Sequence, residues 1–240
     1  MVQSPQASSG MHIIPVIDLL DGLAVHARRG LRSGYRPVAS SLCPDPDPQA
    51  VLRAYLSLYP FRTVYVADLN AIQNTGDNDA VMRGLLAAFP GMEFWLDAGK
   101  ATLKRTVPAL RPVLGTESGI TPGQLKGLNG ARPILSLDFT AAGMLGAQEL
   151  LRQPETWPDE VIIMSLNKVG SEGGPALGLC REIHALTGGR KHLYLAGGAR
   201  DAADVQHASE SGASGMLVAT ALHSRALDPA ALPWAAAEHS

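Results

Sequence analysis

The strongest constraint on the fold is a series of eight short apolar runs, each followed by a longer stretch with a helical pattern. Most runs are apolar throughout, which is typical of strands that are covered on both faces of a parallel sheet. Eight strand–helix units predict an α/β protein with a (β/α)8 barrel, and a doubly wound open sheet is the structural alternative. The expected strands are His12–Ile17, Thr63–Ala67, Glu93–Leu96, Pro112–Leu114, Pro133–Leu137, Val161–Leu166, His192–Ala196 and Gly215–Val218.

Helix start and stop signals lie between these runs. Asp47 before Pro48 is a favourable N-cap and first-turn pair, and Gly188-Gly189 is a typical helix end. The expected helices are Pro48–Tyr59, Asp77–Phe89, Thr102–Leu110, Thr121–Gly127, Gly146–Gln153, Gly174–Leu186, Asp201–Ser211 and Pro229–Glu238.

Length agrees with one such barrel. The chain has 240 residues, and (β/α)8 barrels often use about 250 as a single domain. We expect one domain over residues 11–240, preceded by residues 1–10 as a disordered tail or a non-native extension. Residues 1–10 have neither the basic start nor the apolar stretch of a signal peptide.

Charge and cysteine content exclude several classes of function. Twenty Lys and Arg residues against 22 Asp and Glu give a net charge of −2, which does not supply the basic surface of a nucleic-acid-binding protein. Two cysteines exclude a disulfide scaffold and a four-cysteine zinc module. No apolar run reaches the roughly 18 residues that span a bilayer. We expect a soluble cytoplasmic protein with no metal, cofactor, membrane or nucleic-acid partner, and the sequence leaves the oligomeric state open.

Four short motifs recur in the same order about 100 residues apart. Such an internal repeat predicts a barrel built from two half-barrel repeats. The matching pairs are Asp18 and Asp138, Val64–Asn70 and Val161–Asn167, Leu96–Gly99 and Leu195–Gly198, and Leu114–Thr116 and Val218–Thr220.

Polar residues end five of the predicted strands, at the face where (β/α)8 barrels carry their active sites: Asp18, Asp68, Asp97, Asp138 and Asn167. Asp18 and Asp138 end strands one and five, on opposite sides of the barrel mouth. They suit one base and one acid acting on a substrate between them, and a helix cap or loop anchor is the alternative for each. The acid needs burial or a neighbouring charge to stay protonated at pH 7, because a free carboxyl titrates near pH 4.

Glycine-rich strand ends predict two anion sites, because glycine lets backbone N–H groups approach a phosphate. One site would follow strands seven and eight, and its mirror would follow strands three and four, with ordinary tight turns as the alternative. Two facing sites predict a long ligand with a phosphate at each end. Arg28, Arg29 and Arg32 either clamp an anion or form a solvated face. The predicted substrate-binding residues are Gly99, Gly115, Thr116, Gly197, Gly198, Thr220, Asp68 and Asn167.

Several motifs carry a family resemblance. Ile14–Gly22 resembles the opening motif of the ProFAR isomerase and imidazole glycerol phosphate synthase cyclase family of histidine biosynthesis. Val66–Ala71, Ser136–Phe139 and Gly197-Gly198 are similar to the motifs of strands two, five and seven in that family. The resemblance covers roughly residues 11–225.

The resemblance implies a duplicated half-barrel with two phosphate sites, with Asp18 as base and Asp138 as acid. The family isomerase converts an aminoaldose to an aminoketose by an Amadori rearrangement without metal or cofactor. Four elements depart from the family pattern. Asp97–Ala101 stands in place of Gly-Gly-Gly-Ile-Arg, and the loop after strand five lacks the usual Gly-Trp. Val169–Gly173 lacks the strand-six Asp, and Ala219 replaces a glycine.

Two segments, Asn167–Ser171 and His26–Gly30, resemble a divergent isomerase-like branch found in methanogens and methylotrophs. We expect aldose–ketose isomerisation of a phosphorylated aminosugar, with ProFAR as the default substrate. The alternatives are a related phosphosugar conversion in the synthesis of a one-carbon cofactor (tetrahydromethanopterin or methanofuran) and a non-catalytic paralogue that binds a phosphorylated ligand.

Overall fold

A computed structural model of the chain describes residues 10–27, 34–104, 109–127, 132–171 and 173–232. The expected tail therefore lies outside the described residues except for Gly10, and Arg28, Arg29 and Arg32 also lie outside them. Among the described residues, no helix is both long and apolar enough to cross a bilayer.

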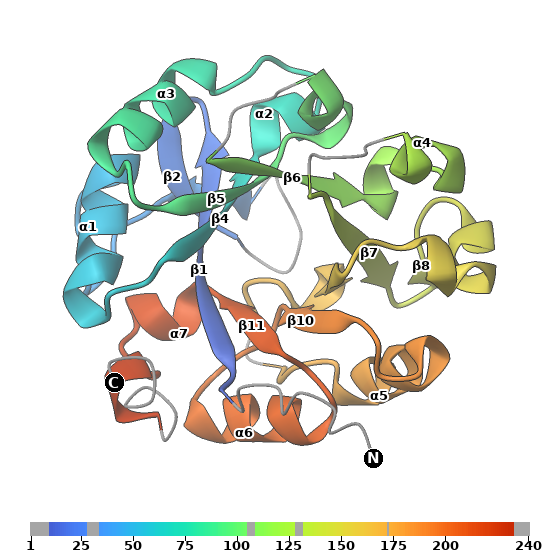
Figure 1. The fold of residues 1–240 in the computed structure, drawn as a ribbon. Helices are drawn as coiled ribbons and strands as arrows, with labels where there is room; N and C mark the ends of the chain where they lie inside the picture. The colour runs from blue at the N-terminus through green and yellow to red at the C-terminus, as the bar shows by residue number, and fades with distance from the viewer. Residues whose placement is uncertain (1–9, 28–33, 105–108, 128–131, 172, 233–240) are drawn as a thin grey trace.

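Eight parallel strands form a closed barrel with helices around it (Figure 1). The last strand pairs with the first, from His12 opposite Gly215 to Pro15 opposite Val218. This closure confirms the predicted (β/α)8 barrel and excludes the open sheet. In order around the barrel the strands are β1 (His12–Leu20), β4 (Thr63–Asp68), β5 (Glu93–Asp97), β6 (Leu110–Gly115), β7 (Ile134–Thr140), β9 (Glu160–Ser165), β10 (His192–Ala196) and β11 (Gly215–Val218).

The strands separate two apolar layers. In β4, Val64 and Val66 belong to the layer between the strands and the helices, whereas Tyr65 and Ala67 belong to the layer inside the barrel. Both faces of each barrel strand are thus covered, which is why the strands read as continuous apolar runs.

Five of the expected helices are present with shifted ends. The predicted caps form: the Asp47 carboxylate accepts a hydrogen bond from the N–H of Ala50 at 3.1 Å, and Gly188 ends its helix with φ of +61°. The helices are α1 (Pro48–Leu58), α3 (Asp79–Ala88), α4 (Pro122–Lys126), α5 (Leu177–Thr187) and α6 (Ala202–Glu210).

Three expected helices are not α-helices where the structure describes them, and residues 105–108 and 233–238 of two of them lie outside the described residues. In place of Thr102–Leu110 there is a 3-10 helix at Gly99–Lys104, and Leu110 already begins β6. In place of Gly146–Gln153 there are short 3-10 turns, because Gln153 precedes a proline and leaves the helical region.

The C-terminal helix was also expected to be longer. The 3-10 turn at Pro229–Ala231 is followed by Leu232 in an extended conformation, and the rest of the expected helix lies outside the described residues. Two short helices, α2 (Leu69–Ile72) and α7 (Thr220–His223), follow β4 and β11 instead.

The first strand extends beyond its predicted end at Ile17. It continues to Leu20 and turns through Asp21 and Gly22, whose φ values of +50° and +83° suit a two-residue hairpin. Asp18 therefore lies inside β1. The hairpin adds β2 (Leu23–His26) and β3 (Arg36–Pro37), and β8 (Gly143–Met144) pairs with the end of β7.

Candidate functional site

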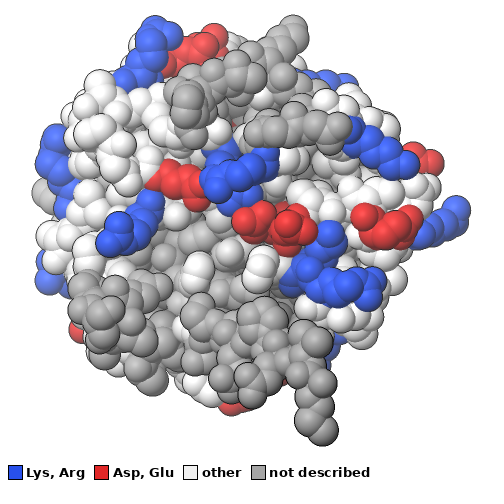
Figure 2. Space-filling model, in the orientation of Figure 1, with Lys and Arg blue, Asp and Glu red and all other residues white. Residues whose placement is uncertain are grey.

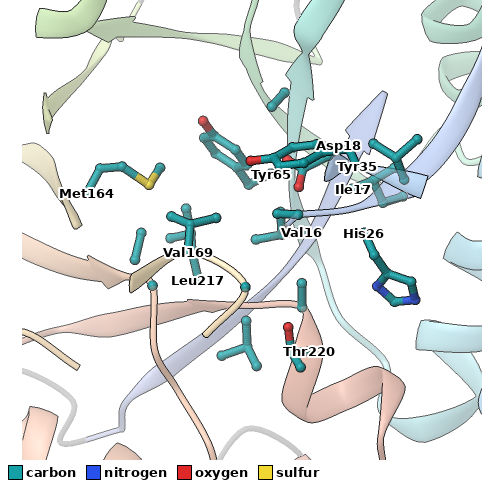
Figure 3. A pocket seen from close by; sticks show the side chains of 18 of the residues that line it. Val16, Ile17, Asp18, His26, Tyr35, Tyr65, Met164, Val169, Leu217 and Thr220 are labelled. Carbon is teal, nitrogen blue, oxygen red and sulfur yellow. The ribbon is translucent and has the colours of Figure 1, made fainter. Parts of the chain in front are cut away.

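A cavity lies at the carboxyl ends of the barrel strands, where the fold predicts a site. Asp18 of β1 and Asp138 of β7 both line it, as do Asp97 of β5 and Glu117, which follows β6. In Figure 3, Asp18 and Tyr65 lie across the cavity from Met164, and Thr220 and His26 lie below them. The described residues that line the cavity include four carboxylates and no Lys or Arg.

Asp138 is almost fully buried, with 4% of its surface exposed. Its Oδ1 accepts a hydrogen bond from the Ser136 hydroxyl at 2.6 Å. Its Oδ2 accepts from the N–H of Glu117 at 2.7 Å and the Thr116 hydroxyl at 3.3 Å. Burial raises the pKa of Asp138 to about 6, because desolvation outweighs these bonds and the Glu117 charge adds to it. Such a carboxyl can hold a proton near neutrality, as a general acid must.

Asp97 is the last residue of β5 and stands where the family pattern has glycine. Its Oδ1 accepts a hydrogen bond from the N–H of Gly99 at 2.9 Å, and its Oδ2 accepts from the Tyr65 hydroxyl at 3.3 Å. Burial raises the pKa of Asp97 to about 7. The charges of Asp138 and Glu117 contribute, while the two hydrogen bonds oppose the rise.

Gly115 lies between these two carboxylates. A Cβ at this position would lie 2.9 Å from Oδ2 of Asp138 and 3.7 Å from Oδ2 of Asp97. A side chain here would displace Asp138, so the glycine permits both carboxylates to approach the end of β6.

Asp18 reaches the cavity from the opposite side of the barrel. It is half-buried and pairs in register with Ala67 of β4 and Val25 of β2. The hairpin strand β2 pairs with this part of β1. The Asp18 carboxylate therefore projects from a strand and not from a loop.

Gly197, Gly198 and Thr220 also line the cavity, on the β10 and β11 side. Gly197 has φ of +99°, and a Cβ there would lie 2.8 Å from the carbonyl oxygen of Ser165. A Cβ on Gly198 would collide with the carbonyl oxygen of Gly174. The two glycines thus let the loop after β10 pack against the loop after β9, while their backbone remains at the cavity wall.

The predicted mirror site has a different structure. Thr116 is fully buried and exchanges hydrogen bonds with Asp138: its hydroxyl oxygen also accepts from the Asp138 N–H at 2.8 Å. Gly99 and Gly115 line a small separate cavity beside Lys100. The structure therefore does not bring Gly99, Gly115 and Thr116 together as a second phosphate site on the main cavity.

Asp68 and Asn167 do not line the main cavity. Asp68 is fully buried and caps α2: its Oδ1 accepts from the N–H of Ala71 and the amide of Asn78, and its Oδ2 accepts from the N–H of Asn78. Asn167 is exposed in a 3-10 turn, where its Oδ1 accepts from the Ser165 hydroxyl at 3.3 Å. The geometry makes Asp68 a helix cap, whereas the sequence predicts that it binds substrate.

Sequence reasoning missed His223, a buried histidine in the lining of the cavity. The Tyr55 hydroxyl donates to the Val16 carbonyl at 2.9 Å, so the Tyr55 oxygen accepts from Nε2 of His223 at 2.8 Å. This places the imidazole proton on Nε2 and leaves Nδ1 to accept from the Ser40 hydroxyl at 2.9 Å. Burial, with a contribution from His26, lowers the pKa of His223 to about 4, so it stays neutral and links Tyr55 of α1 to Ser40.

Tyr65 and Glu117 were also missed. Tyr65 could have been found, since it alternates with outward-facing Val64 and Val66 and so points into the barrel. Glu117 carries no such signal. Among the described residues, no group of three or more His, Cys, Asp and Glu side chains is arranged to hold a metal ion.

Comparisons with known proteins agree with the motifs. Residues 145–228 match the family model described as "Histidine biosynthesis protein". This segment contains Gly197, Gly198 and Thr220, whereas Asp18 and Asp138 precede it. The chain is also 29% identical to an uncharacterized protein of Methanocaldococcus jannaschii over 225 residues, which cover 91% of this chain and 96% of that protein. These similarities agree with the resemblance seen at the strand ends: the C-terminal part of the chain is similar to the histidine biosynthesis protein family, and nearly the whole chain is similar to the archaeal protein.

Proposed function

We propose that the protein is an enzyme that catalyses aldose–ketose isomerisation of a phosphorylated aminosugar by acid–base chemistry. Asp18 and Asp138 carry the proposal, because β1 and β7 are the first and fifth of eight barrel strands and their carboxylates face one cavity from opposite sides. Family members are typically isomerases or cyclases, which supports an enzymatic role.

The two carboxyls fit different steps of an Amadori rearrangement. The Asp138 carboxyl donates its proton to the ring oxygen as the bond from that oxygen to C1 breaks and the nitrogen lone pair forms a C1=N iminium. The Asp18 carboxylate then removes the proton from C2, and the electrons of that C–H bond form the C1=C2 bond of an enolamine. C1 gains a proton and the C2 hydroxyl loses one, so the aminoketose product is an isomer of the substrate.

The environments of the two carboxyls match these roles. The pKa of Asp138 is raised to about 6 by burial, which favours the protonated form that an acid needs. Asp18 is more exposed than Asp138. Gly197, Gly198 and Thr220 at the far wall would bind the phosphate through backbone N–H groups and a hydroxyl.

The decisive experiment measures turnover of ProFAR and then of a panel of phosphorylated aminosugars. Asp18→Asn should lower kcat by roughly 10²–10⁴-fold, because the amide cannot accept the C2 proton. KM should change less, since the phosphate supplies much of the binding. Asp159→Asn is the matched control, because Asp159 lies at the opposite end of the barrel and its side chain is 84% exposed.

The outcomes separate the alternatives. Turnover that survives Asp18→Asn unchanged would remove Asp18 as the base. If wild type turns over no aminosugar but acts on another phosphosugar, the alternative conversion in one-carbon cofactor synthesis gains support. If it binds phosphorylated ligands and converts none, the protein is a non-catalytic paralogue.

A further inference from the structure

The two walls of the cavity present opposite hydrogen-bonding chemistry. β10 and β11 are the seventh and eighth strands around the barrel, and they lie across it from β5 and β6, the third and fourth. The β10 and β11 wall supplies Gly197, Gly198 and Thr220. The β5 and β6 wall supplies the carboxylates of Asp97 and Glu117.

The backbone donors that a second phosphate would need are already used. The N–H of Gly99 donates to Asp97 Oδ1 at 2.9 Å, and the N–H of Glu117 donates to Asp138 Oδ2 at 2.7 Å. The Thr116 hydroxyl is also hydrogen-bonded to Asp138. At the ends of β5 and β6, protein carboxylates thus accept the hydrogen bonds that a bound phosphate would need.

A ligand group at this wall meets acceptor oxygens and negative charge. The charges of Asp97 and Asp138 would repel a second phosphate. The backbone N–H groups that could bind this phosphate would also have to break their hydrogen bonds to the two carboxylates. A protonated nitrogen would instead form charge-assisted hydrogen bonds to the same oxygens.

We infer that the substrate carries one phosphate, bound at the β10 and β11 wall, and a protonated amine or iminium nitrogen, bound between Asp97 and Asp138. Asp97 is then the residue that determines specificity, since it stands where the family pattern has glycine and blocks the second phosphate site. The inference rests on the proposed function for the chemistry at C1, where the iminium nitrogen of the Amadori step would face these carboxylates.

The raised pKa values agree with this arrangement. The groups that face Asp97 are Tyr65 from β4, Asp138 from β7 and Glu117 after β6, and the two acidic neighbours raise its pKa to about 7 in addition to burial. A bound cation would lower that pKa again, so binding of an amine should release protons at pH 6–7.

The test compares three hexose phosphates by titration calorimetry at pH 7: glucosamine 6-phosphate, glucose 6-phosphate and glucose 1,6-bisphosphate. Wild type should bind the amine roughly tenfold more tightly than glucose 6-phosphate, the gain expected from one charge-assisted hydrogen bond. The bisphosphate should bind more weakly than glucose 6-phosphate. Asp97→Asn should abolish the preference for the amine, because its Oδ1 can still accept from Gly99 but the charge is lost. Asp159→Asn should retain the preference.

Equal affinity of wild type for the amine and glucose 6-phosphate, no measurable binding of the amine, or an unchanged preference in Asp97→Asn would overturn the inference. Efficient turnover of ProFAR, a ligand with a phosphate at each end, would also overturn it while leaving the proposed isomerase intact. Conversely, the predicted preference without turnover of any aminosugar would uphold the inference and contradict the isomerase.

Discussion

Buried charged side chains have opposite surroundings at the two ends of the barrel. At the amino ends of the strands, the Arg111 side chain is 6% exposed and donates to both Glu160 oxygens, at 3.1 and 2.8 Å, while its Nε donates to the Arg132 carbonyl at 3.0 Å. Its guanidinium also lies 5.6 Å from the centre of the Trp95 ring. At the mouth, Asp97 and Asp138 approach each other without a Lys or Arg among the described residues of the cavity lining.

The pKa directions follow this difference. Desolvation alone would raise the pKa of Glu160, but the hydrogen bonds and positive charge of Arg111 lower it. At the mouth, burial raises the pKa of Asp97 and Asp138, and the Glu117 charge raises both further. Paired charges thus stabilise the amino end of the barrel. At the mouth, burial of the carboxyls costs free energy of folding, and their raised pKa values suit them to exchange protons or bind a cation.

Breaking the paired end should have the largest effect. Arg111→Met would leave Glu160 without its bidentate partner and should lower the free energy of unfolding by about 3 kcal/mol, since removing one member of a buried pair leaves an uncompensated charge. Urea unfolding at pH 7 measures the loss. The double variant Arg111→Met with Glu160→Gln should recover part of it, and a single variant as stable as wild type would show that the pair contributes nothing.

The barrel strands were largely predictable from sequence, whereas the Arg111–Glu160 pair was not predicted. β4 and β9 read as apolar runs because both faces of these strands are buried, a pattern that depends on little besides the local residues. The expected helix at Thr102–Leu110 overlaps the next strand, which begins earlier than predicted, at Leu110, and pairs there with Phe94. Pairing partners of this kind are set by tertiary structure and leave no local signal.

The mouth was predictable only in part. Asp18 and Asp138 were predicted to lie at the active face because they stand at the carboxyl ends of strands, and both line the cavity there. The sequence could not show that Asp138 would accept a hydrogen bond from the Thr116 hydroxyl, which is 22 residues away in the 3-10 turn after β6. Asp68 likewise looked the same as Asp18 in sequence, and only its hydrogen bond from the N–H of Ala71 reveals a cap.

Removing a charge from the mouth should stabilise the protein in a pH-dependent way. The pKa of Asp97 is about 7 in the folded state against an ordinary value of 3.8, so the folded protein binds more protons between about pH 4 and pH 7. Stability due to this group is therefore present below pH 4 and is lost as the pH rises through 7. Asp97→Asn should be more stable than wild type by about 1 kcal/mol at pH 8, the equivalent of one pKa unit, and no more stable at pH 4. Urea unfolding at both pH values measures this, and the control Asp159→Asn should keep the pH dependence of wild type. An Asp97→Asn variant that also kept it would contradict the prediction.

The smallest expected effect isolates the Glu117 charge. Glu117 binds Asp138 through its backbone N–H, so Glu117→Gln removes the side-chain charge and preserves that hydrogen bond. Because the Glu117 charge raises the pKa of Asp138, the variant should move the limb of the pH–rate profile assigned to the acid to lower pH, by a few tenths of a unit. Loss of activity therefore begins at a lower pH as the acid deprotonates, while kcat at pH 5 stays close to that of wild type. A profile that does not move would mean that solvent screens the exposed Glu117 side chain and that burial alone sets the proton affinity of Asp138.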